Sequence, residues 1–131
     1  MLVDTSVWSL ALRRSAPSRA PEVATLQASL ERGDIVVTTG IILQELLQGF
    51  QGPTARKQII RSFSLLPLLS PDFEDHILAA ELRNRCRRKG VQIGTIDALI
   101  AQLCIRHELA LLTTDRDFER MSRICPLKLQ G

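Results

Sequence analysis

Residues 2–8 read LVDTSVW, so the chain begins with an apolar dipeptide followed directly by a carboxylate and then by hydroxyl residues. The apolar start predicts a short buried strand, and Thr5 or Ser6 can cap a helix that follows it. Asp4 therefore falls at the carboxyl end of a strand. Because α/β proteins bind their ligands beyond the carboxyl ends of parallel strands, Asp4 is a candidate functional residue.

Three later segments each place a candidate acidic residue in or beside a predicted helix. They are TTGIILQELLQGF at residues 38–50 with Glu45, GTIDALIA at 94–101 with Asp97, and LALLTTDRDF at 109–118 with Asp115. Strand-like and helix-like segments alternate between these motifs. Such alternation predicts an α/β fold with a mostly parallel sheet and helices on both of its faces.

The individual elements follow from hydrophobic spacing, β-branched runs and stop signals. Besides the elements around the four motifs, the predicted helices are Glu22 to Arg32 with Gly33 as its stop, Thr54 to Phe63 and Asp72 to Lys89. The predicted strands are Met1 to Asp4, Ile35 to Val37, Leu109 to Thr113 and an edge strand at Leu127 to Leu129, while Leu65 to Leu69 stays open because Pro67 interrupts it. In the longest helix, the apolar residues expected to face inward are Phe73, Ile77, Ala80 and Leu82.

Length and composition favour one compact domain over residues 1–131, because 45% hydrophobic content is ample for a single core. No apolar run approaches the roughly 20 residues that a membrane helix needs. Asp4, Arg13 and Arg14 also argue against a secretory signal at the start of the chain. We therefore expect a cytoplasmic protein without a membrane segment.

The cysteines and histidines do not form metal-binding or disulfide patterns. Cys86, Cys104 and Cys125 are odd in number and widely separated, which indicates reduced thiols. His76 and His107 are equally isolated, and such a histidine is more often a surface or core residue than a ligand. Any bound metal should therefore be a hard cation held by oxygen atoms.

The four acids have individual explanations as well as a joint one. Taken singly, Asp97 and Asp115 are favoured as helix caps, Asp4 can also cap, and Glu45 can be a solvated residue beside an apolar stripe. Taken together, four carboxylates that converge would repel one another, which raises their pKa values unless cations neutralise them. The joint pattern favours a site for Mg²⁺ or Mn²⁺ that activates water toward a phosphodiester.

The charge balance suits a polyanionic partner. The net charge is +3, and setting aside the four candidate acids leaves 17 basic against 10 acidic residues, a balance of +7. With no Tyr, one Trp and four Phe, phosphate contacts are favoured over base stacking. The candidate residues for contacts to a phosphate backbone are Arg83, Arg85, Arg87, Arg88 and Lys89, followed by Arg13 and Arg14. A solvated helix end stabilised by positive charge is the competing explanation for the first group.

The order and spacing of the four motifs resemble the PIN-domain nucleases, and among these the small VapC-type toxins of bacterial toxin–antitoxin pairs. The resemblance covers nearly the whole chain. It implies a three-layer α/β/α fold with a central, mostly parallel sheet of four or five strands, and an Mg²⁺- or Mn²⁺-dependent endoribonuclease. By resemblance, the metal ligands and catalytic acids of the family correspond to Asp4, Glu45, Asp97 and Asp115. Asp117 corresponds to an outer residue or to a ligand of a second metal. Thr5, Ser6, Thr113 and Thr114 match the hydroxyl residues beside the acids, where capping is an equal alternative.

The same resemblance also implies binding partners, and two alternative functions have to be weighed against the nuclease. It implies an RNA substrate, a VapB-like antitoxin and a homodimer. Trp8, Leu46, Leu47 and Phe50 either line an antitoxin groove or, as is favoured, pack in the core. A non-catalytic RNA-binding domain is disfavoured because all four acids are present. A small-molecule phosphatase is disfavoured because Ser6 stands where an aspartyl-nucleophile pattern expects a second acid two residues after Asp4.

Overall fold

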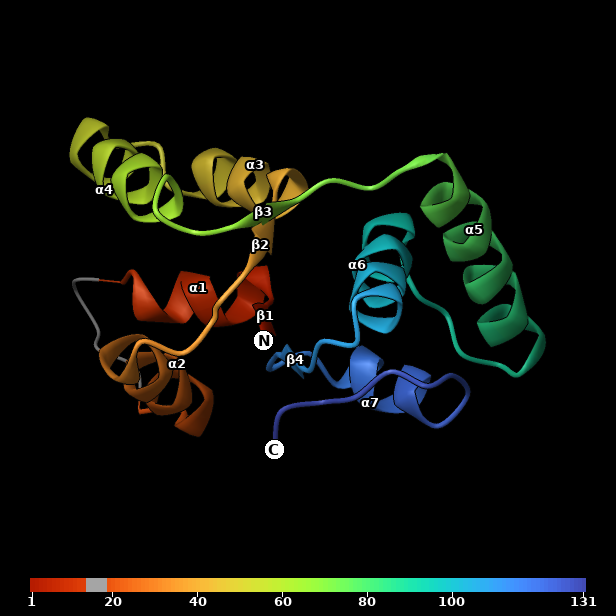
Figure 1. The fold of residues 1–131 in the computed structure, drawn as a ribbon. Helices are drawn as coiled ribbons and strands as arrows, with labels where there is room; N and C mark the ends of the chain where they lie inside the picture. Colours follow the sequence, from red (N-terminus) through yellow and green to blue (C-terminus); the bar gives the residue numbers. More distant parts are fainter. Residues whose placement is uncertain (14–18) are drawn as a thin grey trace.

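The structure, a computed structural model, describes residues 1–13 and 19–131, so the predicted RNA-binding residue Arg14 lies outside the described residues. The helices of the described chain are α1 (Thr5–Ala11), α2 (Pro21–Arg32), α3 (Gly40–Gly49), α4 (Pro53–Phe63), α5 (Phe73–Arg88), α6 (Thr95–Arg106) and α7 (Arg116–Ser122) (Figure 1). The strands are β1 (Leu2–Val3), β2 (Thr38–Thr39), β3 (Leu68–Leu69) and β4 (Leu111–Leu112). The predicted helices are therefore confirmed, with ends shifted by one or two residues. Among the described residues, no helix has both the length and the hydropathy needed to cross a membrane.

The strands pair in parallel, as the sequence predicts. β1 pairs with β4, and β2 pairs with β3. A single parallel bridge between Leu2 and Val37 joins the two pairs, and another between Leu111 and Leu129 extends the sheet past β4. The order is thus β3, β2, β1, β4 and then the segment around Leu129. The predicted edge strand at Leu127 to Leu129 consists only of the bridge between Leu111 and Leu129 among the described residues. The expectation of four or five strands in one sheet stays a prediction.

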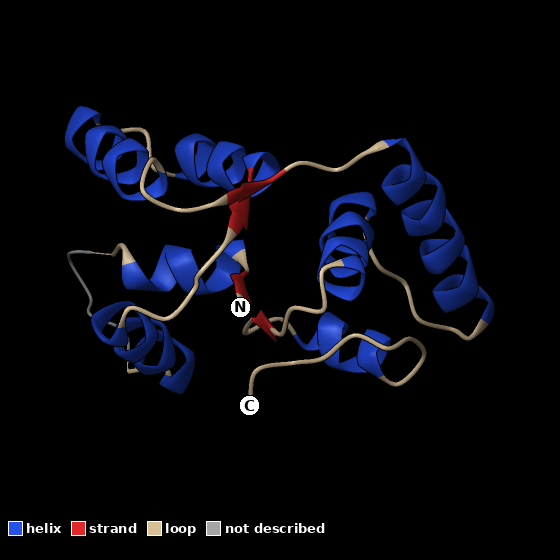
Figure 2. Cartoon of the chain, viewed as in Figure 1, coloured by secondary structure: helices blue, strands red, loops and turns tan. Residues whose placement is uncertain are grey.

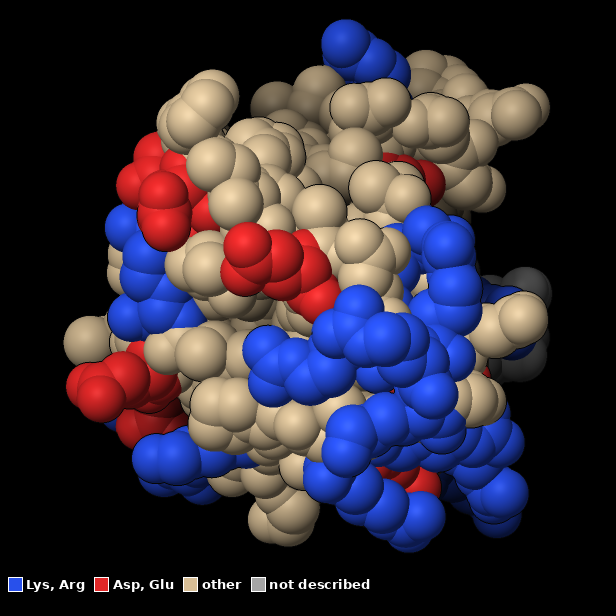
Figure 3. All heavy atoms as spheres, turned by 90° about the vertical axis from the view of Figure 1, so that its right-hand side faces the viewer, with Lys and Arg blue, Asp and Glu red and all other residues tan. Residues whose placement is uncertain are grey.

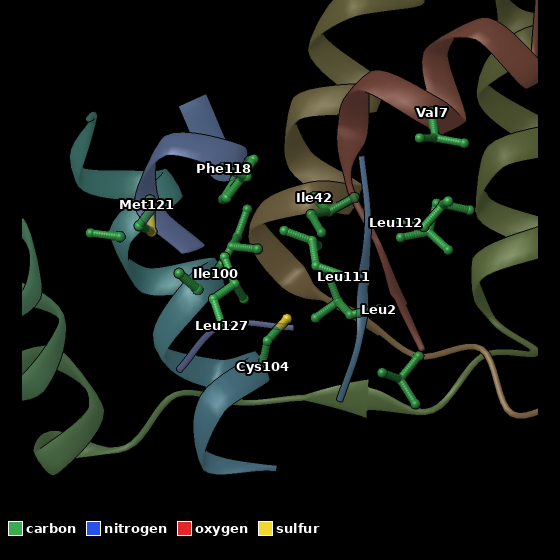
Figure 4. Packing of buried hydrophobic residues seen from close by; sticks show 14 of the residues in the cluster. Leu2, Val7, Ile42, Ile100, Cys104, Leu111, Leu112, Phe118, Met121 and Leu127 are labelled. Atoms are coloured by element: carbon green, nitrogen blue, oxygen red, sulfur yellow. The ribbon is translucent and has the colours of Figure 1, made fainter. Parts of the chain in front are cut away.

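Helices lie on both sides of the strands (Figure 2), and β1, β2 and β4 are buried, whereas Leu68 of β3 is exposed. Leu111 is 0% exposed and Leu112 is 1% exposed. Figure 4 shows Leu111 pointing toward Ile100 and Leu127, whereas Leu112 points to the other side with Val7. This two-sided burial is typical of parallel sheets, and it explains why β1 and β4 are apolar at both positions.

The second predicted strand lies further along the chain than expected. Ile35 is 72% exposed, and the strand is formed instead by Thr38 and Thr39, which are 0% and 1% exposed. Backbone pairing explains the shift, because Val37 N donates to Met1 O at 2.9 Å and Thr38 N donates to Pro67 O at 3.0 Å. The prediction of Ile35 to Val37 as a strand is therefore wrong except at Val37.

The inward face of α5 was predicted correctly at Leu82, which is 3% exposed, but wrongly at the other three residues. Phe73 is 82% exposed and Ile77 is 40% exposed, and Ala80 is exposed as well. The residues of α5 that are buried are Asp75, Ala79, Leu82 and Cys86. These positions follow the 3.6-residue helical period once Asp75 is counted as an inward residue. Asp75 thus stands within the otherwise apolar inward face of α5. Its burial is possible because its carboxylate accepts hydrogen bonds from Asp72 N, Gln102 Nε2 and Arg106 Nη2.

A left-handed glycine ends α2. Gly33 has a φ of 73°, and its N–H and that of Asp34 donate to Leu30 O at 3.2 Å and Ser29 O at 3.0 Å. Gly33→Ala should destabilise the protein by about 1 kcal/mol, because a side chain disfavours this conformation. The matched control is Gly49→Ala inside α3, where a Cβ meets nothing within 4 Å and the change should be neutral or stabilising. Urea denaturation measures both, and equal losses would contradict the explanation.

Candidate metal centre

Asp4 lies where β1 turns into α1, and it is 6% exposed. Its Oδ2 accepts hydrogen bonds from Ser6 Oγ at 2.8 Å and from Thr113 Oγ1 at 2.9 Å. It holds the N-cap position of α1, yet its side chain makes no capping hydrogen bond to the helix backbone. Asp4 is therefore a buried carboxylate oriented by hydroxyl groups rather than a helix cap.

Hydrogen bonds of the same hydroxyl residues, Ser6 and Thr113, connect the loop after β4 to the start of α1. Thr114 N donates to Ser6 Oγ at 3.1 Å, and Asp115 N donates to Thr113 Oγ1 at 3.0 Å. These bonds place Asp115 beside Asp4. Asp115 also accepts from Asp117 N at 2.9 Å through Oδ1, so the capping explanation is confirmed for this residue. Capping and a site role are compatible, because a carboxylate has two oxygens that each accept more than one hydrogen bond.

Glu45 comes from the middle of α3 and is half-buried. Thr5 Oγ1 donates to Glu45 Oε1 at 2.9 Å, which connects α3 to the first residue of α1. The explanation that Glu45 is only a solvated residue is therefore wrong. Thr5 follows Asp4 directly in the chain, so this bond brings the third carboxylate to the same end of the sheet.

Asp97 lies in the first turn of α6, where Gly94 holds the N-cap position. The pKa of Asp97 is raised to about 6, first by burial and then by the charges of Asp4, Asp115, Glu45 and Asp117, in that order. The charges of the other four acids therefore act on Asp97, which places all five in one region of the molecule. The predicted acids thus gather at one end of the sheet, from the ends of β1 and β4 and from α3 and α6.

Asp117 is more peripheral than the other four. Arg120 Nη1 donates to its Oδ1 at 2.8 Å, and the Asp117 side chain is 38% exposed. This ion pair was not among the predicted contacts, although the i,i+3 spacing of Asp117 and Arg120 on a helix could have indicated it. An arginine that already neutralises Asp117 makes it a weaker candidate ligand.

The donor set suits a hard divalent cation. The site offers carboxylate and hydroxyl oxygens, which Mg²⁺ and Mn²⁺ prefer, and the raised pKa of Asp97 reports a surplus of negative charge. Among the described residues, however, no three His, Cys, Asp or Glu side chains stand close enough to hold a metal ion as they are placed.

The remaining residues to which the sequence assigned a role lie outside the acid cluster. The basic residues Arg83, Arg85, Arg87, Arg88 and Lys89 occupy the last turns of α5, and Arg13 is exposed beyond α1. Trp8 and Leu46 are 5% and 1% exposed, so ordinary core packing is confirmed for these two. All three cysteines are free and buried, as predicted for reduced thiols.

Comparisons with known proteins agree with this arrangement. The PIN domain family model matches residues 1–124. The VapC ribonuclease Mb1587 of Mycobacterium bovis and the ribonuclease VapC11 of Mycobacterium tuberculosis are each 32% identical over 130 residues, covering 98% of this chain and 96% of theirs.

Solved structures show the same fold. VapBC2 from Rickettsia felis bound to a fragment of promoter DNA has a TM-score of 0.76 at 22% identity, covering 98% of this chain and 96% of that one. FitAcB from Neisseria gonorrhoeae has a TM-score of 0.71 at 21% identity, covering 99% and 96%. From its family match and its relatives over nearly the whole length, the chain belongs to the PIN-domain family and, within it, to the VapC ribonucleases.

Proposed function

We propose that this protein is an endoribonuclease that acts as the toxin of a toxin–antitoxin pair and hydrolyses RNA phosphodiester bonds with Mg²⁺ or Mn²⁺. The observation that carries the proposal is the gathering of carboxylates at one end of the sheet, where Thr113 holds Asp4, Thr5 holds Glu45, and the charges of these acids act on Asp97. A cluster of that charge is costly to the fold, and a bound cation relieves it. Family membership supports the nuclease activity, and the oxygen-only donor set supports the choice of metal.

Asp4, Glu45, Asp97 and Asp115 are the residues that we propose hold the metal. When bound, the ion supplies a water of lowered pKa and neutralises charge on the departing oxygen. Ser6 and Thr113 hold the Asp4 carboxylate in place, and Thr5 does the same for Glu45. Such supporting hydrogen bonds fix the orientation of ligands that would otherwise be mobile. Asp117 is proposed as an outer residue, because Arg120 pairs with it.

The proposed partners follow from the charge distribution and the relatives. The basic residues of α5 are proposed to contact the RNA backbone, with Arg13 and Arg14 as a second group. Since the solved relatives include VapBC complexes, we propose that a VapB-like antitoxin silences the enzyme and that the toxin forms a homodimer. We place the activity in the cytoplasm, because three free buried cysteines suit a reducing compartment.

The test is cleavage of RNA compared with cleavage of a small phosphoester. We expect the purified protein to cut oligoribonucleotides in Mg²⁺ or Mn²⁺ and to stop when EDTA is added, since the activated water depends on the cation. It should leave p-nitrophenyl phosphate intact. Gel electrophoresis of labelled RNA and absorbance of nitrophenolate measure the two reactions. Equal activity on the small ester would favour a phosphatase, and tight RNA binding without cleavage would favour a non-catalytic domain.

A further inference from the structure

A polar hollow opens beside the acid cluster, at the connection between α5 and α6. It has a volume of about 500 Å³. Its lining residues are Arg83, Arg87, Val91, Gln92, Ile93 and Gly94. Gly94 is the N-cap of α6, and Asp97 follows three residues later, which is roughly 5 Å along a helix axis. The hollow is therefore a direct neighbour of the proposed metal ligands, and we call it the loop hollow.

The basic residues of α5 do not all face this hollow. Arg83 and Arg87 are four residues apart, so they share one face of the helix, and both line the loop hollow. Arg85 lines a different hollow on another side of α5, together with Gln102 and Cys125. Figure 3 shows Lys and Arg side chains gathered over one part of the surface to which α5 belongs. Of the basic residues of α5, Arg83 and Arg87 are the two that line the loop hollow.

Arg83 is held in position for an anion. Its Nε donates to Ile93 O at 2.8 Å, which fixes the guanidinium against the wall of the hollow. That bond uses one of the five N–H donors of an arginine, and the remaining donors form a fork that matches two phosphate oxygens. Arg87 is exposed and adds a second positive charge, and Gln92 adds a neutral amide.

We infer that the loop hollow binds one backbone phosphate of the RNA strand, adjacent to the phosphate that is cut. This inference rests on the proposed nuclease function. Two guanidinium groups select an anion, and no aromatic residue lines the hollow to stack a base. Phosphate is the anion that recurs along RNA, and contacts to it position the strand without reading its sequence. Arg83 and Arg87 thereby set the register of the RNA over the acids.

A binding experiment tests the hollow without requiring cleavage. The probe is a fluorescein-labelled single-stranded RNA of random sequence, titrated in EDTA at several KCl concentrations and followed by fluorescence anisotropy. Arg87→Ala should weaken binding about tenfold and reduce the slope of log affinity against log salt by about 0.7. Arg61→Ala removes the same charge from an exposed position on α4, outside the basic residues of α5, and it should weaken binding less than about threefold. Equal losses in the two variants would overturn the inference.

A cleavage experiment then tests the register. Substrates that carry a single neutral methylphosphonate at successive positions around the cut should reveal one flanking position that lowers kcat/KM about tenfold in the wild type. In Arg87→Ala that position should no longer matter. If the variant keeps the same sensitivity, the phosphate is held elsewhere and the inference fails. If the wild type cuts no RNA, the proposed function fails, while the anisotropy result still decides whether the hollow binds a phosphate.

Discussion

Asp97→Asn should lower the rate of RNA cleavage by more than about 100-fold while making the metal-free protein more resistant to heat. The activity falls because a proposed ligand is lost, and even residues that only support metal ligands contribute about 10- to 100-fold. The stability rises because four neighbouring carboxylates oppose the charge of Asp97, and the amide removes that repulsion. Activity and stability should therefore change in opposite directions.

The measurements are single-turnover cleavage of RNA and thermal unfolding with and without Mg²⁺. Mg²⁺ should raise the unfolding temperature of the wild type and have a smaller effect on the variant, since a ligand that binds the folded state stabilises it. Glu81→Gln removes an exposed charge from α5 and serves as the control, with cleavage close to wild type. Asp4→Asn should also lose cleavage. Wild-type cleavage by pure Asp4→Asn and Asp97→Asn would rule out the proposed metal centre.

Arg106→Met should lower the free energy of unfolding by about 2 to 3 kcal/mol at neutral pH, through the buried carboxylate of Asp75. Asp75 is 0% exposed and accepts from Arg106 Nη2 at 2.7 Å and from Asp72 N at 3.0 Å. Removing the arginine leaves a buried charge without its partner. The expected loss is at the lower end for such pairs, because the Arg106 side chain is 36% exposed and Asp75 keeps its backbone bond.

This effect should depend on pH in a defined direction. Burial raises the pKa of Asp75, but hydrogen bonds from Asp72, Arg106 and Gln102 and the charge of Arg106 outweigh it, so the pKa lies below its ordinary value of 3.8. A lowered pKa gives stability that is present above about pH 4 and is lost as the pH falls through the folded-state pKa. The difference between wild type and Arg106→Met should therefore be full at pH 7 and shrink below pH 4.

Urea denaturation at a series of pH values measures the free energy of unfolding of both proteins. Arg85→Met is the matched control, because Arg85 is exposed and has no carboxylate partner among the described ion pairs. A loss as large in the control, or a loss in Arg106→Met that stays constant down to pH 3, would contradict the role of Asp75.

Local sequence was sufficient for the parts of the fold that depend on neighbours in the chain. Gly33 marks the end of α2, and the short apolar runs before Asp4 and Asp115 mark strands because a parallel sheet buries its residues on both faces. The gathering of the acids at one end of the sheet follows from parallel strands, whose carboxyl ends share one edge.

Features that depend on distant partners could not be predicted. Phe73 was assigned to the core and Asp75 was not, although the reverse holds. The burial of Asp75 depends on Gln102 and Arg106, which are 27 and 31 residues away on α6. Likewise, the bond from Thr113 to Asp4 spans 109 residues, and no local pattern indicates whether a threonine caps a helix or orients a carboxylate.

The central position of β1 has a consequence for the timing of synthesis. β4, which pairs with β1, and Thr113, which orients the Asp4 carboxylate, are synthesised more than a hundred residues after Asp4. Until they are made, β1 lacks its neighbour on one side, and Asp4 lacks one of the two hydroxyl donors that hold its carboxylate. A fragment of the chain that ends before β4 therefore cannot complete the acid cluster.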